Sequence, residues 1–251
     1  MTSYLLSIHY MDWILPALLA IPVVGAVLVL GAPGAKPALG TDEVAAGLAT
    51  APRWIAFITL LVECLMSLGL WWAFDPTVAG WQAVFDRPWI PNWGIRFSLG
   101  IDGIAMMMIL LTTIIMVLSV LGSWTGIRTR TRGYYALMLV LTAGLLGAFM
   151  SLDLFLFYVL WEAMLIPMYF LIGIWGYDQR IYAAIKFMLY TMAGSVLMLL
   201  AILGLAYMHS AATGSYSFDL LKLYTLDIPP QTQYWFFLAF ALAFAIKVPM
   251  F

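Results

Sequence analysis

Four ionisable residues fall within long apolar runs of this sequence, where a charge is costly, and they are the first candidates for chemistry. They are Glu63, Glu162, Lys186 and Lys247. Ionisable side chains inside membrane-spanning segments mark ion and proton pathways. Carboxyl and amino groups bind and release protons, so the predicted chemistry is proton transfer.

Glu162 is predicted to lie near the middle of the membrane. It follows Asp153 by nine residues, which is about 13 Å of helix in a hydrocarbon core about 30 Å thick. Pro167 cannot donate to the carbonyl of Ala163 and is expected to kink the helix beside the carboxyl. A functional role is favoured, because an isolated structural carboxyl could be replaced more cheaply by Gln; the alternative is a structural carboxyl bonded to a neighbouring helix.

Lys247 is the second strong candidate because a proline follows it closely. It lies 13 residues after Tyr234, or about 20 Å along a helix. Pro249 leaves the carbonyl of Ala245 without its donor, so a helix break is predicted here. Broken membrane helices occur where protein or a water-filled cavity satisfies the backbone. The alternative role for Lys247 is only to bind the freed carbonyls.

Lys186 and Glu63 are weaker candidates. Lys186 lies about one turn into its apolar run, and a lysine there can also reach the headgroups with its long stem. Glu63 lies in the middle of its run, one turn from both Thr59 and Ser67. For Glu63 the favoured interpretation is a structural carboxyl that is hydrogen-bonded or protonated.

The elements that must position these residues are seven apolar runs, each long enough to cross a membrane as a helix. They are residues 13–31, 54–74, 103–124, 134–152, 154–175, 182–208 and 234–251. The sequence therefore predicts an all-α polytopic membrane protein with one membrane domain over residues 1–251. The segment from Asp75 to Asp102 is rich in Pro and Trp and is predicted to be ordered at the membrane interface. Because residue 251 falls inside the last run, the chain is expected to continue further.

Composition supports the membrane class and excludes others. Apolar residues make up 65% of the 251 residues and charged residues only 9%, against about 25% charged in soluble proteins. The net charge of -1 argues against binding a phosphate backbone. Cys64 is the single cysteine, so neither a zinc site nor an iron–sulfur cluster is predicted in this chain.

The distribution of basic residues predicts the orientation. The loops after the first, third and fifth runs hold Lys36, Arg53, Arg128, Arg130, Arg132 and Arg180, and the loops after the second and sixth hold Arg87, Arg96 and Lys222. Basic loops remain on the cytoplasmic side. The N-terminus is therefore expected outside.

Three stretches resemble the M-type antiporter-like membrane subunits of respiratory complex I, which correspond to mitochondrial chain 4. They are residues 151–186 (SLDLFLFYVLWEAMLIPMYFLIGIWGYDQRIYAAIK) with the following FMLYT, residues 99–113 (LGIDGIAMMMILLTT) and residues 244–251 (FAIKVPMF). The resemblance covers most of the chain from about Ile95 onward.

The resemblance implies a proton-translocating subunit of NADH:quinone oxidoreductase. Family members are about twice this length, with about 14 helices in inverted repeats. Glu162 and Lys247 match the family's buried pair and Lys186 its helix-six lysine, whereas Glu63 matches no motif. No cofactor is implied in this chain; FMN, iron–sulfur clusters and quinone belong to partner subunits. L-type and N-type antiporter-like subunits are the implied neighbours, in the bacterial cytoplasmic membrane or an equivalent energy-transducing membrane.

Two other classes of function remain open from the sequence. One is a subunit of a multisubunit sodium/proton antiporter or of a membrane-bound hydrogenase-type complex, which would share the buried charges. The other is a passive membrane scaffold, for which buried charges would be unnecessary.

Overall fold

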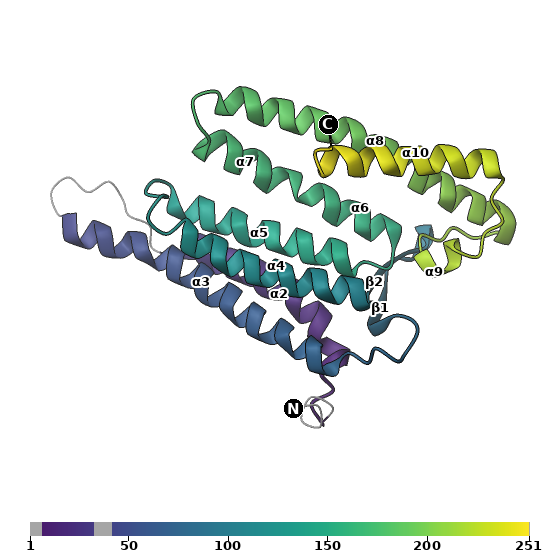
Figure 1. Cartoon of the computed structure of the whole chain (residues 1–251), viewed down its shortest axis with the longest axis horizontal. Helices are drawn as coiled ribbons and strands as arrows, with labels where there is room; N and C mark the ends of the chain where they lie inside the picture. The colour runs from purple at the N-terminus through teal and green to yellow at the C-terminus, as the bar shows by residue number, and fades with distance from the viewer. Residues whose placement is uncertain (1–6, 33–41, 251) are drawn as a thin grey trace. The chain divides into compact units, whose positions relative to one another are not determined.

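The computed structural model describes residues 7–32 and 42–250, and its packing divides the chain into two compact units (Figure 1). The first unit contains the described residues up to Phe85 together with Gly100–Met150. The second contains Asp86–Leu99 and the described residues from Ser151 onward. Lys36 lies outside the described residues.

The predicted helical membrane architecture is confirmed. Within the described ranges, six helices are long and apolar enough to cross a membrane: Tyr10–Gly31, Thr50–Ala73, Gly103–Gly122, Thr131–Met150, Leu154–Trp175 and Arg180–Thr213. The seventh apolar run of the sequence forms α10 (Pro230–Lys247), whose first turn is the polar sequence PQTQ.

The first unit is built from four helices. These are α2 (Tyr10–Gly31), α3 (Asp42–Ala73), α4 (Gly103–Gly122) and α5 (Thr131–Met150). Helix α2 packs against α3 and α5, and α3 also packs against α4. At Gly25 the approach is close, because a Cβ atom there would lie 2.5 Å from the Cγ2 atom of Thr59. Small residues permit this kind of contact between membrane helices.

A two-stranded hairpin occupies the segment predicted to be ordered at the interface. It consists of β1 (Gln82–Ile90), a 3-10 turn (Pro91–Trp93) and β2 (Ile95–Ile101). Gly94 follows the turn with a φ of 69°, which favours glycine. A Cβ at Gly94 would also lie 2.0 Å from the backbone oxygen of Tyr216.

The second unit contains the helices that carry Glu162, Lys186 and Lys247. They are α6 (Leu154–Ala163), α7 (Leu165–Trp175), α8 (Arg180–Thr213), the short α9 (Leu220–Leu223) and α10. Helix α8 packs against α7 and α10, and the α8–α10 pair runs side by side in Figure 1. Two glycines of α8, Gly194 and Gly204, lie against α10, where added Cβ atoms would come within 2.7 Å of Ile246 and Phe236 respectively.

Candidate functional site

The site is organised by an interruption in the helix that carries Glu162. Helix α6 ends at Ala163 and α7 begins at Leu165, with Met164 between them. Pro167 lies in the first turn of α7, and proline cannot donate to the carbonyl four residues earlier. Glu162 thus lies in the last turn of one half-helix and just before the next. Such paired helix ends present opposite partial charges.

The Glu162 carboxyl is only partly matched by polar groups. Its Oε1 atom is buried and has no hydrogen-bond partner among the described residues. Ser195 of α8, Lys247 of α10 and Tyr158 of α6 are polar side chains that interact with it. Glu162 and Lys247 do not form an ion pair within 4.0 Å, since the ion pairs between described residues lie elsewhere.

Lys247 binds the C-terminal end of α6. Its Nζ donates to the backbone oxygen of Trp161 at 3.2 Å and lies 4.7 Å from the centre of the Trp161 ring. The last four carbonyls of a helix lack intrahelical donors, and the helix dipole makes that end negative. The ammonium group therefore donates a charge-assisted hydrogen bond to the Trp161 carbonyl, makes a cation–π contact with the Trp161 ring and lies at the negative end of the α6 dipole.

Aromatic rings surround the Lys247–Trp161 contact. The Trp161 ring lies 5.4 Å from that of Phe157 and 5.4 Å from that of Phe244. Phe240 packs against Phe244 at 6.0 Å. An apolar surrounding of this kind strengthens electrostatic interactions by lowering the local dielectric constant.

The structure does not place Lys186 with Glu162 and Lys247. Lys186 is exposed on α8, and its Nζ lies 5.8 Å from the centre of the Tyr182 ring. It lines a shallow hollow of about 550 Å³ together with Tyr182 and Tyr190. Along α8 it is nine residues from Ser195, or about 13 Å.

Glu63 is placed in the first unit, on α3. Its side chain is 0% exposed, and neither carboxyl oxygen has a hydrogen-bond partner among the described residues. The sequence-based preference for a structural carboxyl assumed either hydrogen bonding or protonation. The described structure provides no hydrogen-bond partner.

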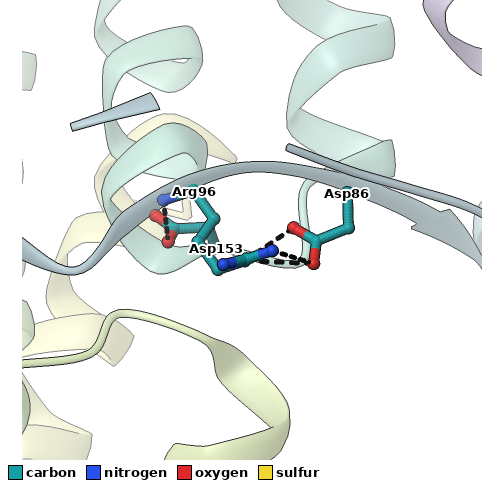
Figure 2. Close-up of polar contacts among 3 residues, drawn as sticks. All are labelled: Asp86, Arg96 and Asp153. Atoms are coloured by element: carbon teal, nitrogen blue, oxygen red, sulfur yellow. Dashed lines mark hydrogen bonds and ion pairs between the residues drawn. The ribbon is translucent and has the colours of Figure 1, made fainter. Parts of the chain in front are cut away.

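Asp153 fixes the start of α6 and also binds the backbone of Arg96, whose side chain binds Asp86 (Figure 2). The Asp153 carboxylate accepts from the backbone nitrogens of Phe155 and Leu156, both at 3.0 Å, and of Arg96 at 3.1 Å. The Arg96 side chain in turn binds Asp86, with Nε 2.8 and 3.0 Å from the two carboxylate oxygens. Burial raises the pKa of Asp153, against the three backbone donors, which lower it. These bonds anchor β2 to the helix that carries Glu162.

Two contributors to the site were missed by the sequence analysis. Trp161 acts through its backbone carbonyl, which any residue type would supply, and through its ring. The only available signal was its position next to Glu162. Ser195 follows Gly194 on α8, and a small polar residue in an apolar run is a weak signal.

No group of three or more His, Cys, Asp or Glu side chains that could hold a metal ion occurs in the described parts of the chain.

Comparison with known proteins gives a consistent family resemblance. Residues 151–251 match the family model described as NADH:quinone oxidoreductase/Mrp antiporter, TM. NADH-quinone oxidoreductase subunit M of Escherichia coli K12 is 41% identical over 211 residues, which cover 79% of this chain and 41% of that protein. The chain therefore spans about two fifths of the length of this curated relative.

Solved structures agree in fold. A chain of respiratory complex I from Thermus thermophilus matches with a TM-score of 0.74 and 32% identity, covering 94% of this chain and 44% of that one. A chain of the Mrp complex from Dietzia sp. matches with a TM-score of 0.72 at 20% identity, covering 93% of this chain and 23% of that one. At that identity the second match shows the fold alone.

Proposed function

Because this chain is a homologue of NADH-quinone oxidoreductase subunit M, we propose that it is a proton-translocating membrane subunit of that complex. In this proposal, quinone reduction elsewhere in the complex drives proton movement through Glu162 and Lys247. The observation that carries the proposal is the convergence of both residues on the interruption between α6 and α7.

The two side chains can act as a coupled acid–base pair. In a low-dielectric site each charged form is destabilised by loss of water and stabilised by the opposite charge. Protons then leave and enter the pair as a unit. A movement that separates Lys247 from Glu162 removes this mutual stabilisation, so the ammonium releases a proton and the carboxylate takes one up. The Trp161 carbonyl holds Lys247 at the start of this step.

Lys186 enters the proposal as a relay at the edge of the pathway. Its exposed position on α8, beside a hollow lined by Tyr182 and Tyr190, would allow it to exchange protons with groups outside the described residues. Its separation from Ser195 means that any transfer to Glu162 requires intervening water or further polar groups.

The complete complex must supply the redox chemistry. FMN, iron–sulfur clusters and quinone are assigned to partner subunits, and L-type and N-type antiporter-like subunits are proposed as membrane neighbours. The proposed location is the bacterial cytoplasmic membrane or an equivalent energy-transducing membrane, with the N-terminus outside. In this arrangement the present chain contributes the proton path and no redox centre.

The test is Glu162→Gln in the assembled complex, reconstituted in proteoliposomes. The amide keeps the volume and can still bond to Ser195, but it cannot carry a proton or a negative charge. We expect loss of most proton translocation and coupled quinone reduction, with assembly intact. Asp178→Asn, which alters an exposed carboxyl of the same unit, is the control and should translocate normally. Near-normal translocation by assembled Glu162→Gln contradicts the proposal and favours a scaffold.

A second candidate is a subunit of a multisubunit sodium/proton antiporter or hydrogenase-type complex. It is supported by the family description, which includes Mrp antiporters, and by the fold shared with the Dietzia Mrp complex. The native complex distinguishes the candidates. Flavin and iron–sulfur signals that respond to NADH support the first, and sodium-dependent proton exchange without these signals supports the second.

A further inference from the structure

Helix α3 contains a buried carboxyl that the proposed mechanism does not use. Glu63 is 0% exposed in the first unit, and both of its oxygens lack a hydrogen-bond partner among the described residues. A buried polar atom without a partner is uncommon in native structures and requires an explanation. For a carboxyl, the explanation depends on whether it carries a proton.

Among the described residues, no charged side chain pairs with the Glu63 carboxyl. Helices α2, α4 and α5 pack against α3 or its neighbours, and α4 has no ionisable side chain between Gly103 and Gly122. The ionisable groups of the other helices, with their partners, are Tyr10 (Met66 carbonyl), Asp12 (His9), Arg132 (Leu30 carbonyl), and Tyr134 and Tyr135 (Ser123). On α3 itself, Arg53 binds the carbonyl of Ile127, and Cys64 is the adjacent residue. An unpaired carboxylate here would therefore bear the full desolvation penalty of several kcal/mol.

Hydroxyl groups lie one turn from Glu63 in both directions along α3. Ser67 is four residues later and Thr59 four residues earlier, so both share its helix face. The Ser67 hydroxyl is 0% exposed and lies 2.9 Å from that of Thr113 on α4, which is also buried. Thr59 supplies the polar side chain in an otherwise apolar groove of about 430 Å³ between α2 and α3. Three residues of α3 and one of α4 thus form a polar stripe inside an apolar unit: Thr59, Glu63, Ser67 and Thr113.

We propose that Glu63 is a second proton-binding site of the chain, which holds a proton in the described conformation and exchanges it through the hydroxyls of Ser67 and Thr113. A neutral carboxyl removes the ionic cost of burial and retains a proton that can be passed on. In the described conformation the Ser67 and Thr113 hydroxyls donate to the carbonyls of Cys64 and Leu110. Hydroxyl groups both donate and accept, so after these hydroxyls rotate, Ser67 can accept the Glu63 proton as it passes its own to Thr113, which passes its proton to water. This site goes beyond the Glu162–Lys247 pair and does not depend on it.

Labelling with dicyclohexylcarbodiimide tests whether Glu63 carries a proton. This apolar reagent reacts with protonated carboxyls. Because Pro88 prevents tryptic cleavage after Arg87, residues 54–96 form the tryptic fragment that contains both Glu63 and the exposed Asp75. Hydrogen bonds from Thr77 lower the pKa of Asp75, so Asp75 is ionised at pH 8 and serves as an internal control. In the assembled complex at pH 8 we expect an adduct on Glu63, none on Asp75, and loss of the adduct in Glu63→Gln. An unmodified Glu63, or equal modification of Glu63 and Asp75, overturns the proposal.

Variants test whether the proton is exchanged during turnover. If Glu63 transfers a proton, Glu63→Asp should retain more proton translocation than Glu63→Gln, and Thr113→Val should lower translocation as well. If Glu63 is only structural, the order reverses, because Gln fills the site and the shorter Asp leaves a void. Translocation by Glu63→Gln at or above that of Glu63→Asp, or normal translocation by Thr113→Val, overturns the exchange. The labelling of Glu63 does not depend on Glu162. If the proposed function fails, the labelling experiment therefore still tests whether Glu63 carries a proton.

Discussion

Gly194 determines how closely α10 can approach α8, and its replacement should displace Lys247. A Cβ atom at this position would lie 2.7 Å from the Cδ1 atom of Ile246 and 3.4 Å from the Cα atom of Ala243. A normal carbon–carbon contact is about 3.5–4.0 Å, so even alanine requires Ile246 to recede by about 1 Å. Leucine adds three further carbons against the α10 backbone. Overpacking of this kind costs about 1–3 kcal/mol.

Gly204→Leu is a matched control for Gly194→Leu. Gly204 lies on the same helix pair, where a Cβ would be 2.7 Å from the Cζ atom of Phe236, but it is ten residues, or about 15 Å, further along α8. Both variants should therefore lower the thermal stability of the assembled complex by similar amounts. Only Gly194→Leu acts next to Ile246, the residue before Lys247.

The assay is NADH-driven proton uptake by proteoliposomes that contain the assembled complex. A displacement of about 1 Å at a reacting group can cost about 100-fold in rate, so we expect Gly194→Leu to lose at least tenfold more translocation than Gly204→Leu. Thermal melting of both complexes verifies that the loss does not come from stability. Equal translocation by the two variants, at comparable thermal stability, would refute the idea that α8 packing positions Lys247.

Three further predictions address charge, capping and orientation. Lys247→Arg should lose translocation in the proteoliposome assay despite its retained charge, because guanidinium does not release its proton; normal translocation would show that no proton passes through residue 247. Asp153→Asn should lower the free energy of unfolding by about 1–3 kcal/mol. The remaining side-chain oxygen can still cap α6, but the amide nitrogen cannot accept the hydrogen bond from the Arg96 backbone. Burial raises the pKa of Asp153 in the folded state. The contribution of Asp153 to the free energy of unfolding is therefore full below its unfolded-state pKa of about 4 and declines as pH rises through its folded-state pKa. The loss of stability in Asp153→Asn should accordingly shrink as pH rises, and a loss that grows with pH would contradict this sign. With Cys64 replaced, a cysteine at Arg130 should react with an impermeant reagent only from the cytoplasmic side and one at Arg87 only from the outside, and the reverse pattern would contradict the proposed orientation.

The sequence alone was sufficient to locate the membrane helices and the proline-linked helix ends. An apolar run of about 20 residues makes its backbone hydrogen bonds within itself when it forms a helix, whatever its neighbours in the membrane. The apolar runs therefore correspond closely to the helices observed. The effect of proline is also local, because a missing N–H group and a steric clash act within four residues. The helix is interrupted at Met164 near Pro167, and α10 ends at Lys247 just before Pro249.

Tertiary structure decided which of these groups meet. Sequence spacing puts residue 166 one turn from Glu162, but the side chain of Ile166 is 58% exposed. The spacing of Lys186 on α8 likewise could not reveal that its side chain is exposed. The bond from Lys247 to the Trp161 carbonyl joins residues 86 positions apart. Such a bond depends on how α6 and α10 pack rather than on either sequence segment, and every residue type has the same backbone carbonyl. For the same reason, only the packed structure could show that Glu63 is enclosed without a hydrogen-bond partner, because its burial is produced by side chains from several helices together.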